Sequence, residues 1–231
     1  MEIIMEAIAH ISTKFRDKFG VPRQSGITSG MSGKIVFEPK FRRAEAFKEL
    51  ENFSHIWIIW EFSEIDKDKE WSPTVRPPKL GGNKRVGVFA TRSPYRPNRM
   101  GLSSVRLDRI DFDCADAPVL YVTGADMVDG TPIFDIKPYL PYVDCHPDAK
   151  GGYTEDIYAK RLAVRFKDGI TKNIPQNTLD DIADILSADP RPSYQNDAGR
   201  TYGMFYDSFN IKFKVSDGVL TVCEISQNPK E

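Results

Sequence analysis

Apolar and polar residues alternate with a period of two along much of the first 140 residues, and this alternation predicts β-strands. The run at 55–62, HIWIIWEF, is apolar nearly throughout, as expected for a strand buried on both faces. Only residues 44–51 have a helical pattern there. Many strands separated by turn residues predict a closed or strongly curved sheet. The expected strands lie within residues 6–12, 33–39, 55–62, 84–90, 103–112, 118–126 and 131–140.

The alternation changes phase inside one of these segments, SSVRLDRIDF at 103–112. Val105 and Leu107 occupy odd positions, whereas Ile110 and Phe112 occupy even positions. A shift of one residue within a strand predicts a β-bulge, which is a common way of curving a sheet.

A different pattern begins after residues 144–156, which contain proline, a glycine pair and several charges. We expect a domain boundary here, with one domain at 1–146 and a second at 147–231. The second half predicts a strand within 160–169, a helix within 177–188 that starts at a capping box of Thr178 and Asp181, and a hairpin around Asp217-Gly218. Together these elements predict a small α+β unit that packs against the first domain.

Composition narrows the class of protein. The chain has 231 residues, of which 40% are hydrophobic, so it can build a sizeable core. No run of 18 apolar residues and no signal peptide are evident, and the three cysteines are far apart. We therefore expect a cytoplasmic protein with no disulfide framework and no membrane span.

Charge is unevenly distributed along the chain. The net charge of −1 argues against a generally basic nucleic-acid binder. Residues 76–109, however, contain nine Lys or Arg residues and one acidic residue, Asp108. Within them, Pro94 and Pro97 stiffen the loop RSPYRPNRM, which leads into a strand. Such a segment attracts polyanions.

Familiar chemical motifs are missing from the chain. It has no G-x-G-x-x-G after a strand, no Walker A loop, no Cys-x-x-Cys pair and no G-x-S-x-G. The segment DCHPD at 144–148 has metal-ligating residue types, but it lacks distant partners, so no metal site is expected. The residues alone predict a β-rich domain with a rigid basic loop that binds an anion, and they leave its chemistry open.

Four long blocks, at 19–27, 53–62, 75–107 and 129–144, together resemble the TrmO-type (YaeB-like) tRNA methyltransferase family. DPRPSY at 189–194 and FNIKFKV at 209–215 are similar to its C-terminal unit. The resemblance implies a mainly β protein: a single β-barrel that binds S-adenosylmethionine without a Rossmann fold, followed by a small α+β domain. It also implies a homodimer that methylates the exocyclic nitrogen of threonylcarbamoyl-adenosine at position 37 of tRNA, next to the anticodon.

The resemblance also implies which residues bind the cofactor. The amide of Gln24 can pair with an adenine or amino-acid edge, the guanidinium of Arg92 suits the methionine carboxylate, and Asp126 suits the ammonium or the ribose. The full set is Pro22, Arg23, Gln24, Ser63, Glu64, Arg92, Leu102, Gly124, Ala125 and Asp126.

The acceptor nitrogen is a poor nucleophile because it is acylated, so catalysis has to align it, and a base would help. Candidates for the base lie in DIKPYLPYVD, and the sequence does not choose among them: Asp135, Lys137, Tyr139, Tyr142 and Asp144. Lys137 is alternatively a partner for the threonyl carboxylate. The candidates for contacts with tRNA are Lys40, Arg42, Arg43, Arg85, Arg96, Arg99, Arg191 and Tyr194.

Two other functions stay open. One is an RNA-binding barrel that has lost catalysis, and the other is a methyltransferase with a different substrate. A binding protein would need the arginines, but it would not need Gln24, Asp126 or an intact 135–142 segment. Because all of these are present, we favour the enzyme.

Overall fold

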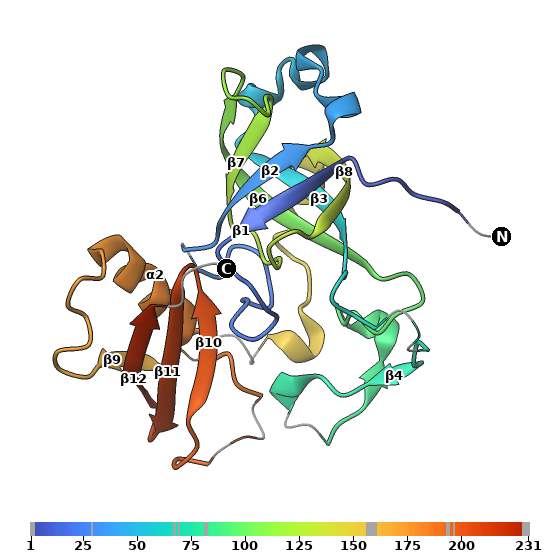
Figure 1. Cartoon of the computed structure of the whole chain (residues 1–231). Coiled ribbons are helices and arrows are strands. Elements are labelled where there is room, and N and C mark those ends of the chain that lie inside the picture. The colour runs from blue at the N-terminus through green and yellow to red at the C-terminus, as the bar shows by residue number, and fades with distance from the viewer. Residues whose placement is uncertain are drawn as a thin grey trace.

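The structure is a computed structural model that describes residues 3–28, 30–66, 68, 70–80, 83–155, 161–192, 195 and 197–227. Six antiparallel strands close into a barrel in the order β1-β2-β7-β6-β3-β8 (Figure 1). The mainly β prediction with a barrel is therefore confirmed. The barrel strands are β1 (Ala9–Thr13), β2 (Ser32–Phe37), β3 (His55–Glu61), β6 (Met100–Asp111), β7 (Val119–Thr123) and β8 (Pro132–Pro138).

Alternate residues of each strand fill the barrel interior, which explains the period of two. The predicted bulge is confirmed, because the register of β6 on β7 shifts between Leu107 and Arg109. The prediction that 55–62 is buried on both faces is wrong. Ile56, Ile58 and Trp60 point into the core, whereas alternate residues such as Trp57 lie partly exposed on the outer face, because a single closed barrel has only one interior.

Short elements cover the two ends of the barrel. The predicted helix at 44–51 is two 3₁₀ turns, η2 (Ala44–Phe47) and η3 (Leu50–Asn52), separated by Glu49 with a left-handed φ of 70°. They follow η1 (Pro39–Phe41) at the end of the barrel where β3 begins. Beyond the end of β3, residues 71–80 and 83–99 form what we term the β4–β5 arm. It contains β4 (Thr74–Val75), η4 (Pro78–Leu80), β5 (Val86–Gly87) and η5 (Val88–Ala90).

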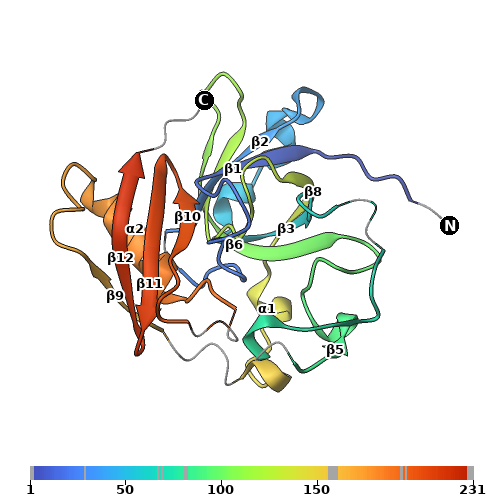
Figure 2. The same ribbon diagram turned by 60° about the horizontal axis from the view of Figure 1, so that its bottom comes forward.

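The C-terminal part is a four-stranded sheet in the order β10-β11-β12-β9 with a helix on one face (Figures 1 and 2). The predicted hairpin is confirmed, with positive φ at Asp217 and Gly218 in its turn. The elements after the barrel are α1 (Pro141–Asp144), η6 (Gly152–Thr154), β9 (Ala163–Phe166), α2 (Gln176–Ser187), β10 (Tyr202–Tyr206), β11 (Phe209–Ser216) and β12 (Val219–Gln227). No helix in these described ranges is long and apolar enough to cross a membrane.

The helix is confirmed, but its predicted capping box is wrong. Pro175 is the N-cap and no side chain caps the helix, because Thr178 lies buried in the first turn. Asp181 instead accepts hydrogen bonds from Lys14 (3.0 Å) and from the hydroxyl of Tyr206 (2.8 Å). Asp181 thus ties the helix to the sheet below it and to the segment that follows β1.

The barrel and the C-terminal unit share packing. Phe15 and Met31, which lie near the two ends of the connection between β1 and β2, are buried in the core of the C-terminal unit with Ile182 and Phe213. The β4–β5 arm also contacts the C-terminal unit, because Lys79 donates a 2.8 Å hydrogen bond to the carbonyl of Asp189. These contacts fix the C-terminal unit beside the end of the barrel from which the arm projects.

Candidate functional site

A large cavity of about 1750 Å³ lies at this end of the barrel. Its walls come from residues 18–24 after β1, residues 60–65 at the end of β3, the β4–β5 arm, the start of β6 and residues 126–128. Pro190 and Pro192 of the C-terminal unit also line it. Sites for small molecules typically measure roughly 300–1,000 Å³, so this cavity has room for more than one small ligand.

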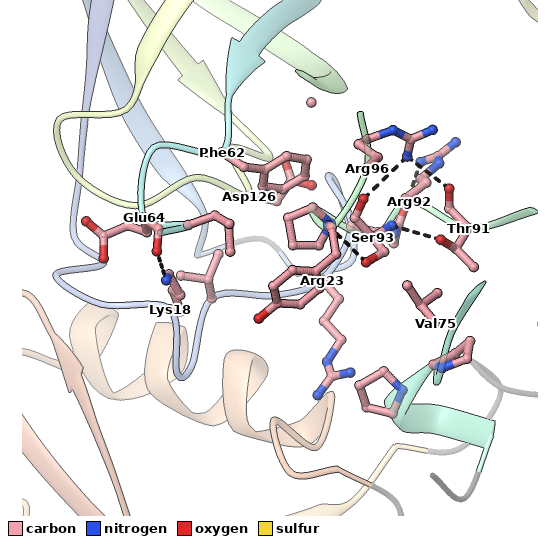
Figure 3. Close-up of a pocket in the computed structure, with 18 of the residues that line it drawn as sticks. Lys18, Arg23, Phe62, Glu64, Val75, Thr91, Arg92, Ser93, Arg96 and Asp126 are labelled. Carbon is pink, nitrogen blue, oxygen red and sulfur yellow. Dashed lines mark hydrogen bonds between the residues drawn. The ribbon is translucent and has the colours of Figure 1, made fainter. Parts of the chain in front are cut away.

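Most of the residues expected to bind the cofactor meet at this cavity. They come from segments that are far apart in the sequence, and Figure 3 shows Asp126 beside Phe62, with Arg92 and Arg96 across the cavity on the loop before β6. The expected residues that line the cavity are Pro22, Arg23, Gln24, Ser63, Glu64, Arg92, Leu102 and Asp126.

Gly124 and Ala125 do not line the cavity. Ala125 is 0% exposed and belongs to the barrel core. Gly124 adopts a φ of 102°, which disfavours any residue with a side chain. The backbone amides of both residues donate to the carbonyl of Met31, at 2.8 and 3.0 Å. The two residues therefore act on the site indirectly, by turning the chain so that Asp126 faces the cavity.

A chain of hydrogen bonds holds Asp126 from inside the barrel. The indole nitrogen of Trp60 donates to the hydroxyl of Ser103 at 3.0 Å, and this hydroxyl donates to the Asp126 carboxylate at 2.5 Å. Ser103 is 2% exposed and Trp60 is 6% exposed, so both are fixed by packing. Gly101 allows this arrangement, since a Cβ there would lie 2.2 Å from the Trp60 ring.

Burial sets the charge state of Asp126. Desolvation raises the pKa of its carboxyl group to about 6, against the opposing effects of the Ser103 hydrogen bond and the Arg92 charge. Arg92 in turn donates a hydrogen bond to the Gln24 side-chain oxygen at 2.5 Å. The cavity therefore presents a carboxylate, a guanidinium and an amide close together, which suits a ligand with both a cationic and an anionic group.

The loop before β6 is held rigid by its own contacts. The guanidinium of Arg96 donates to the carbonyls of Thr91 (3.1 Å) and Ser93 (3.4 Å). Arg99 donates to the carbonyl of Ile65 at 3.2 Å. Together with the prolines, these bonds keep the loop at a fixed height beside the cavity, so Arg92 loses little conformational entropy when it binds a ligand.

None of the five candidates for a catalytic base lines this cavity: Asp135, Lys137, Tyr139, Tyr142 and Asp144. Lys137 and Asp135 form an ion pair with each other at 2.7 Å. The side chain of Tyr142 is 85% exposed. Tyr139 lies in a second cavity of about 470 Å³, which it shares with Arg92.

The second cavity has an aromatic wall. The rings of Trp57 and Tyr139 have centroids 5.6 Å apart, and His55 lies beside Tyr139. Asp144 also lines this cavity. Its carboxylate accepts hydrogen bonds from the Leu140 amide and from the Trp57 indole, both at 2.9 Å, and these bonds lower the pKa of the carboxyl group. Within the described ranges, no group of three His, Cys, Asp or Glu residues could hold a metal ion.

Comparisons with known proteins place the chain in a family. The family model described as the tRNA-methyltransferase O N-terminal domain matches residues 10–145, and the model of the TrmO C-terminal domain matches residues 159–228. The chain belongs to the tRNA-methyltransferase O (TrmO) family. The predicted resemblance is thereby confirmed.

Individual relatives agree with this assignment. The tRNA (adenine(37)-N6)-methyltransferase of Escherichia coli K12 is 40% identical over 221 residues, which cover 92% of this chain and 93% of the relative. A relative from Pseudomonas aeruginosa, named as an S-adenosylmethionine-dependent methyltransferase, is 38% identical over 205 residues, covering 85% of this chain and 86% of its own. A crystal structure of TrmO from Pseudomonas aeruginosa superposes with a TM-score of 0.77 at 28% identity, covering 98% of this chain and all of the other.

The structure separates the basic residues expected to contact tRNA. Arg85 and Arg96 line the large cavity. Lys40, Arg42 and Arg43 lie instead on or beside η1, at the opposite end of the barrel (Figure 1). Lys40 pairs with Glu6 there, and Arg42 pairs with Asp116 at 2.8 Å.

Arg191 does not match its expected role as a phosphate contact. It is 7% exposed, and its guanidinium binds both carboxylate oxygens of Asp189, at 2.9 and 3.1 Å, and the carbonyl of Gln195. This buried network fixes the turn that carries Pro190 and Pro192 to the cavity. The other expected contact from this unit, Tyr194, lies outside the described residues.

Sequence reasoning missed several residues at the site. Lys18 lines the cavity but lies outside the four blocks, and Phe62 lines it as the last residue of the 53–62 block, where the sequence assigns it no role. Ser103 left a detectable signal, because it stands in phase with Val105 and Leu107, which point into the core. A hydroxyl at a core position of a strand needs a buried partner. The sequence could not show that the partner is Asp126, since the two residues meet only when the barrel closes.

Proposed function

We propose that this TrmO-family chain is an S-adenosylmethionine-dependent tRNA (adenine(37)-N6)-methyltransferase whose acceptor is threonylcarbamoyl-adenosine. The observation that carries the proposal is the convergence of Gln24, Arg92 and Asp126 on one cavity. These residues come from three separate segments of the chain. The tRNA (adenine(37)-N6)-methyltransferase of Escherichia coli matches 92% of this chain.

The residues of the cavity fit S-adenosylmethionine. The guanidinium of Arg92 can bind the methionine carboxylate, and the carboxylate of Asp126 can accept from the ammonium or the ribose. The apolar side chains of Phe62 and Leu102 supply walls for the adenine. When bound, S-adenosylmethionine supplies an electrophilic methyl group on a sulfonium, which needs no metal ion and no phosphate-binding loop.

We place the acceptor base toward the second cavity, which meets the first one at Arg92. Tyr139 is the candidate from the 135–142 segment that shares this cavity, so we assign it to the contact with the acceptor. Holding the acylated nitrogen in line with the methyl carbon is then the main task of the protein.

We further propose a cytoplasmic homodimer with a domain boundary at residues 146 and 147. The boundary is supported by the two family models, which end at residue 145 and begin at residue 159. Two exposed apolar side chains on α1, away from the large cavity, support self-association: Tyr142 (85%) and Val143 (51%).

Transfer of a labelled methyl group to tRNA tests the proposed reaction. We expect the wild-type chain to label tRNA from cells that lack this gene. Arg92→Ala should weaken binding of S-adenosylmethionine about tenfold to a hundredfold, measured by calorimetry, because a charge-assisted pair is lost. A chain that binds tRNA but transfers no label would instead support a non-catalytic RNA-binding barrel.

A further inference from the structure

Two large aromatic side chains of the β4–β5 arm lie together in solvent. Trp71 is 48% exposed and Phe89 is 75% exposed. Their ring centroids are 6.5 Å apart and their planes differ by 26°, so the rings are nearly parallel. Burying such rings is strongly favourable, so a stacked pair left open to solvent beside a cavity indicates an interaction surface.

The backbone places the two rings side by side. β4 and β5 pair antiparallel, with Thr74 opposite Gly87, and the pairing continues where the Val88 amide donates to the Pro73 carbonyl at 3.0 Å. Val88 is 1% exposed and anchors this end of the arm. The position of the rings is therefore set by the strand pairing and by Val88, which leaves the outer faces of the rings available to a partner.

The charge around the pair favours an anionic partner. From Trp71 to Arg92 the chain has five Lys or Arg residues and no Asp or Glu; one acidic residue, Glu70, directly precedes Trp71 and also lines the large cavity. Arg76 and Arg85 line the large cavity together with Phe89. Aromatic rings flanked by positive charge are the combination that single-stranded nucleic acid requires, since its bases stack on the rings and its phosphates pair with the cations.

We propose that Trp71 and Phe89 form a stacking platform for an unpaired RNA base that neighbours the methylated one. This inference rests on the proposed function, because an enzyme that modifies an exocyclic nitrogen has to take its target base out of the stack. The neighbouring base then loses a stacking partner, and the platform replaces it. Arg76 and Arg85 bind the phosphates on either side.

Binding of a short RNA with and without bases tests the platform. The probes are a fluorescein-labelled ten-nucleotide oligoriboadenylate and an abasic strand with the same number of phosphates. The Trp71→Ala/Phe89→Ala double variant should bind the first probe about tenfold more weakly than wild type does, since the bases lose the aromatic rings on which they stack. Its affinity for the abasic strand and its salt dependence should not change, because the phosphate contacts remain.

Phe112→Ala is the matched control. Phe112 is 46% exposed, but it follows the far end of β6, away from the cavity. We expect this variant to bind both probes as wild type does. A second comparison separates stacking from simple hydrophobic contact: Phe89→Trp should retain the affinity, whereas Phe89→Leu should lose it as Phe89→Ala does.

Equal loss of affinity for both probes, or no loss in the folded double variant, would overturn the platform. So would loss of self-association on sedimentation, which would indicate that a second copy covers the rings. Methyl transfer by the wild-type chain is measured alongside. If wild type methylates tRNA while the double variant binds both probes normally, the platform alone fails. If wild type neither binds nor methylates tRNA, the proposed function fails with it.

Discussion

Replacing Asp126 by asparagine should make the protein more stable and less able to bind its cofactor. The pKa of the Asp126 carboxyl group is raised from 3.8 to about 6, so the folded protein holds this proton more tightly than the unfolded chain does. The stabilising effect of protonation is complete below about pH 4 and is lost as the pH rises through 6. At neutral pH wild type therefore keeps an unfavourable charge in a partly desolvated site.

The magnitude follows from the size of the pKa shift. A change of one pKa unit corresponds to about 1.4 kcal/mol of folding stability. A shift of about two units means that the charged Asp126 lowers the free energy of unfolding by as much as about 3 kcal/mol at pH 8, and by about half of that at pH 5. Asparagine stays neutral at both values, and its side-chain oxygen can still accept the Ser103 hydrogen bond. Asp126→Asn should therefore raise the free energy of unfolding by up to about 3 kcal/mol at pH 8, and by less at pH 5.

Urea unfolding at both pH values measures this difference, and calorimetry measures the affinity for S-adenosylmethionine. We expect the affinity of Asp126→Asn to fall about tenfold at pH 8, because the ammonium or ribose loses a charged partner. A variant that is less stable than wild type at pH 8, or one whose stability difference does not change between the two pH values, would refute the assignment of Asp126 as a buried, charged ligand-binding group.

Two further substitutions test the interior of the barrel. Ser103→Ala removes the hydrogen bond to the carboxylate, so the pKa of Asp126 should rise by about one unit above 6. The pH below which the affinity for the cofactor falls should rise by the same amount. Ser104→Ala, on the outer face of β6, is the control and should leave this pH unchanged. Gly101→Ala places a Cβ 2.2 Å from the Trp60 ring and should destabilise the fold by about 3 kcal/mol, seen as a lower thermal midpoint, and an unchanged midpoint would contradict this packing.

The sequence predicted best those elements that depend on residues next to one another in the chain, such as strands, a bulge and a turn. The phase change before Arg109 and the Asp217-Gly218 turn each depend on neighbouring residues, and the structure confirms both. The alternation predicted the barrel strands, but at 84–90 only Val86–Gly87 is a strand, and Val88–Ala90 is a 3₁₀ turn outside the barrel. The capping box failed because the tertiary contacts of Asp181 with Lys14 and Tyr206 replaced a local cap.

The site was harder to predict because it is assembled across the chain. Motif resemblance identified Gln24, Arg92 and Asp126, yet the residue that holds Asp126 is a serine on another strand. The sequence also did not show which of the basic residues reach the cavity. Arg42 is paired at the opposite end of the barrel, and Arg191 is buried on Asp189. Only closure of the barrel and docking of the C-terminal unit determine which charges face the cavity.

Nucleoside analysis of tRNA after the reaction tests the central claim most directly. The protein is incubated with S-adenosylmethionine and two tRNA pools from cells that lack this gene, one with the threonylcarbamoyl group and one without it. Mass spectrometry should find a new methyl group on threonylcarbamoyl-adenosine in the first pool and none in the second. Methylation in both pools would mean that the enzyme methylates a different base, and no methylation in either pool would contradict the account.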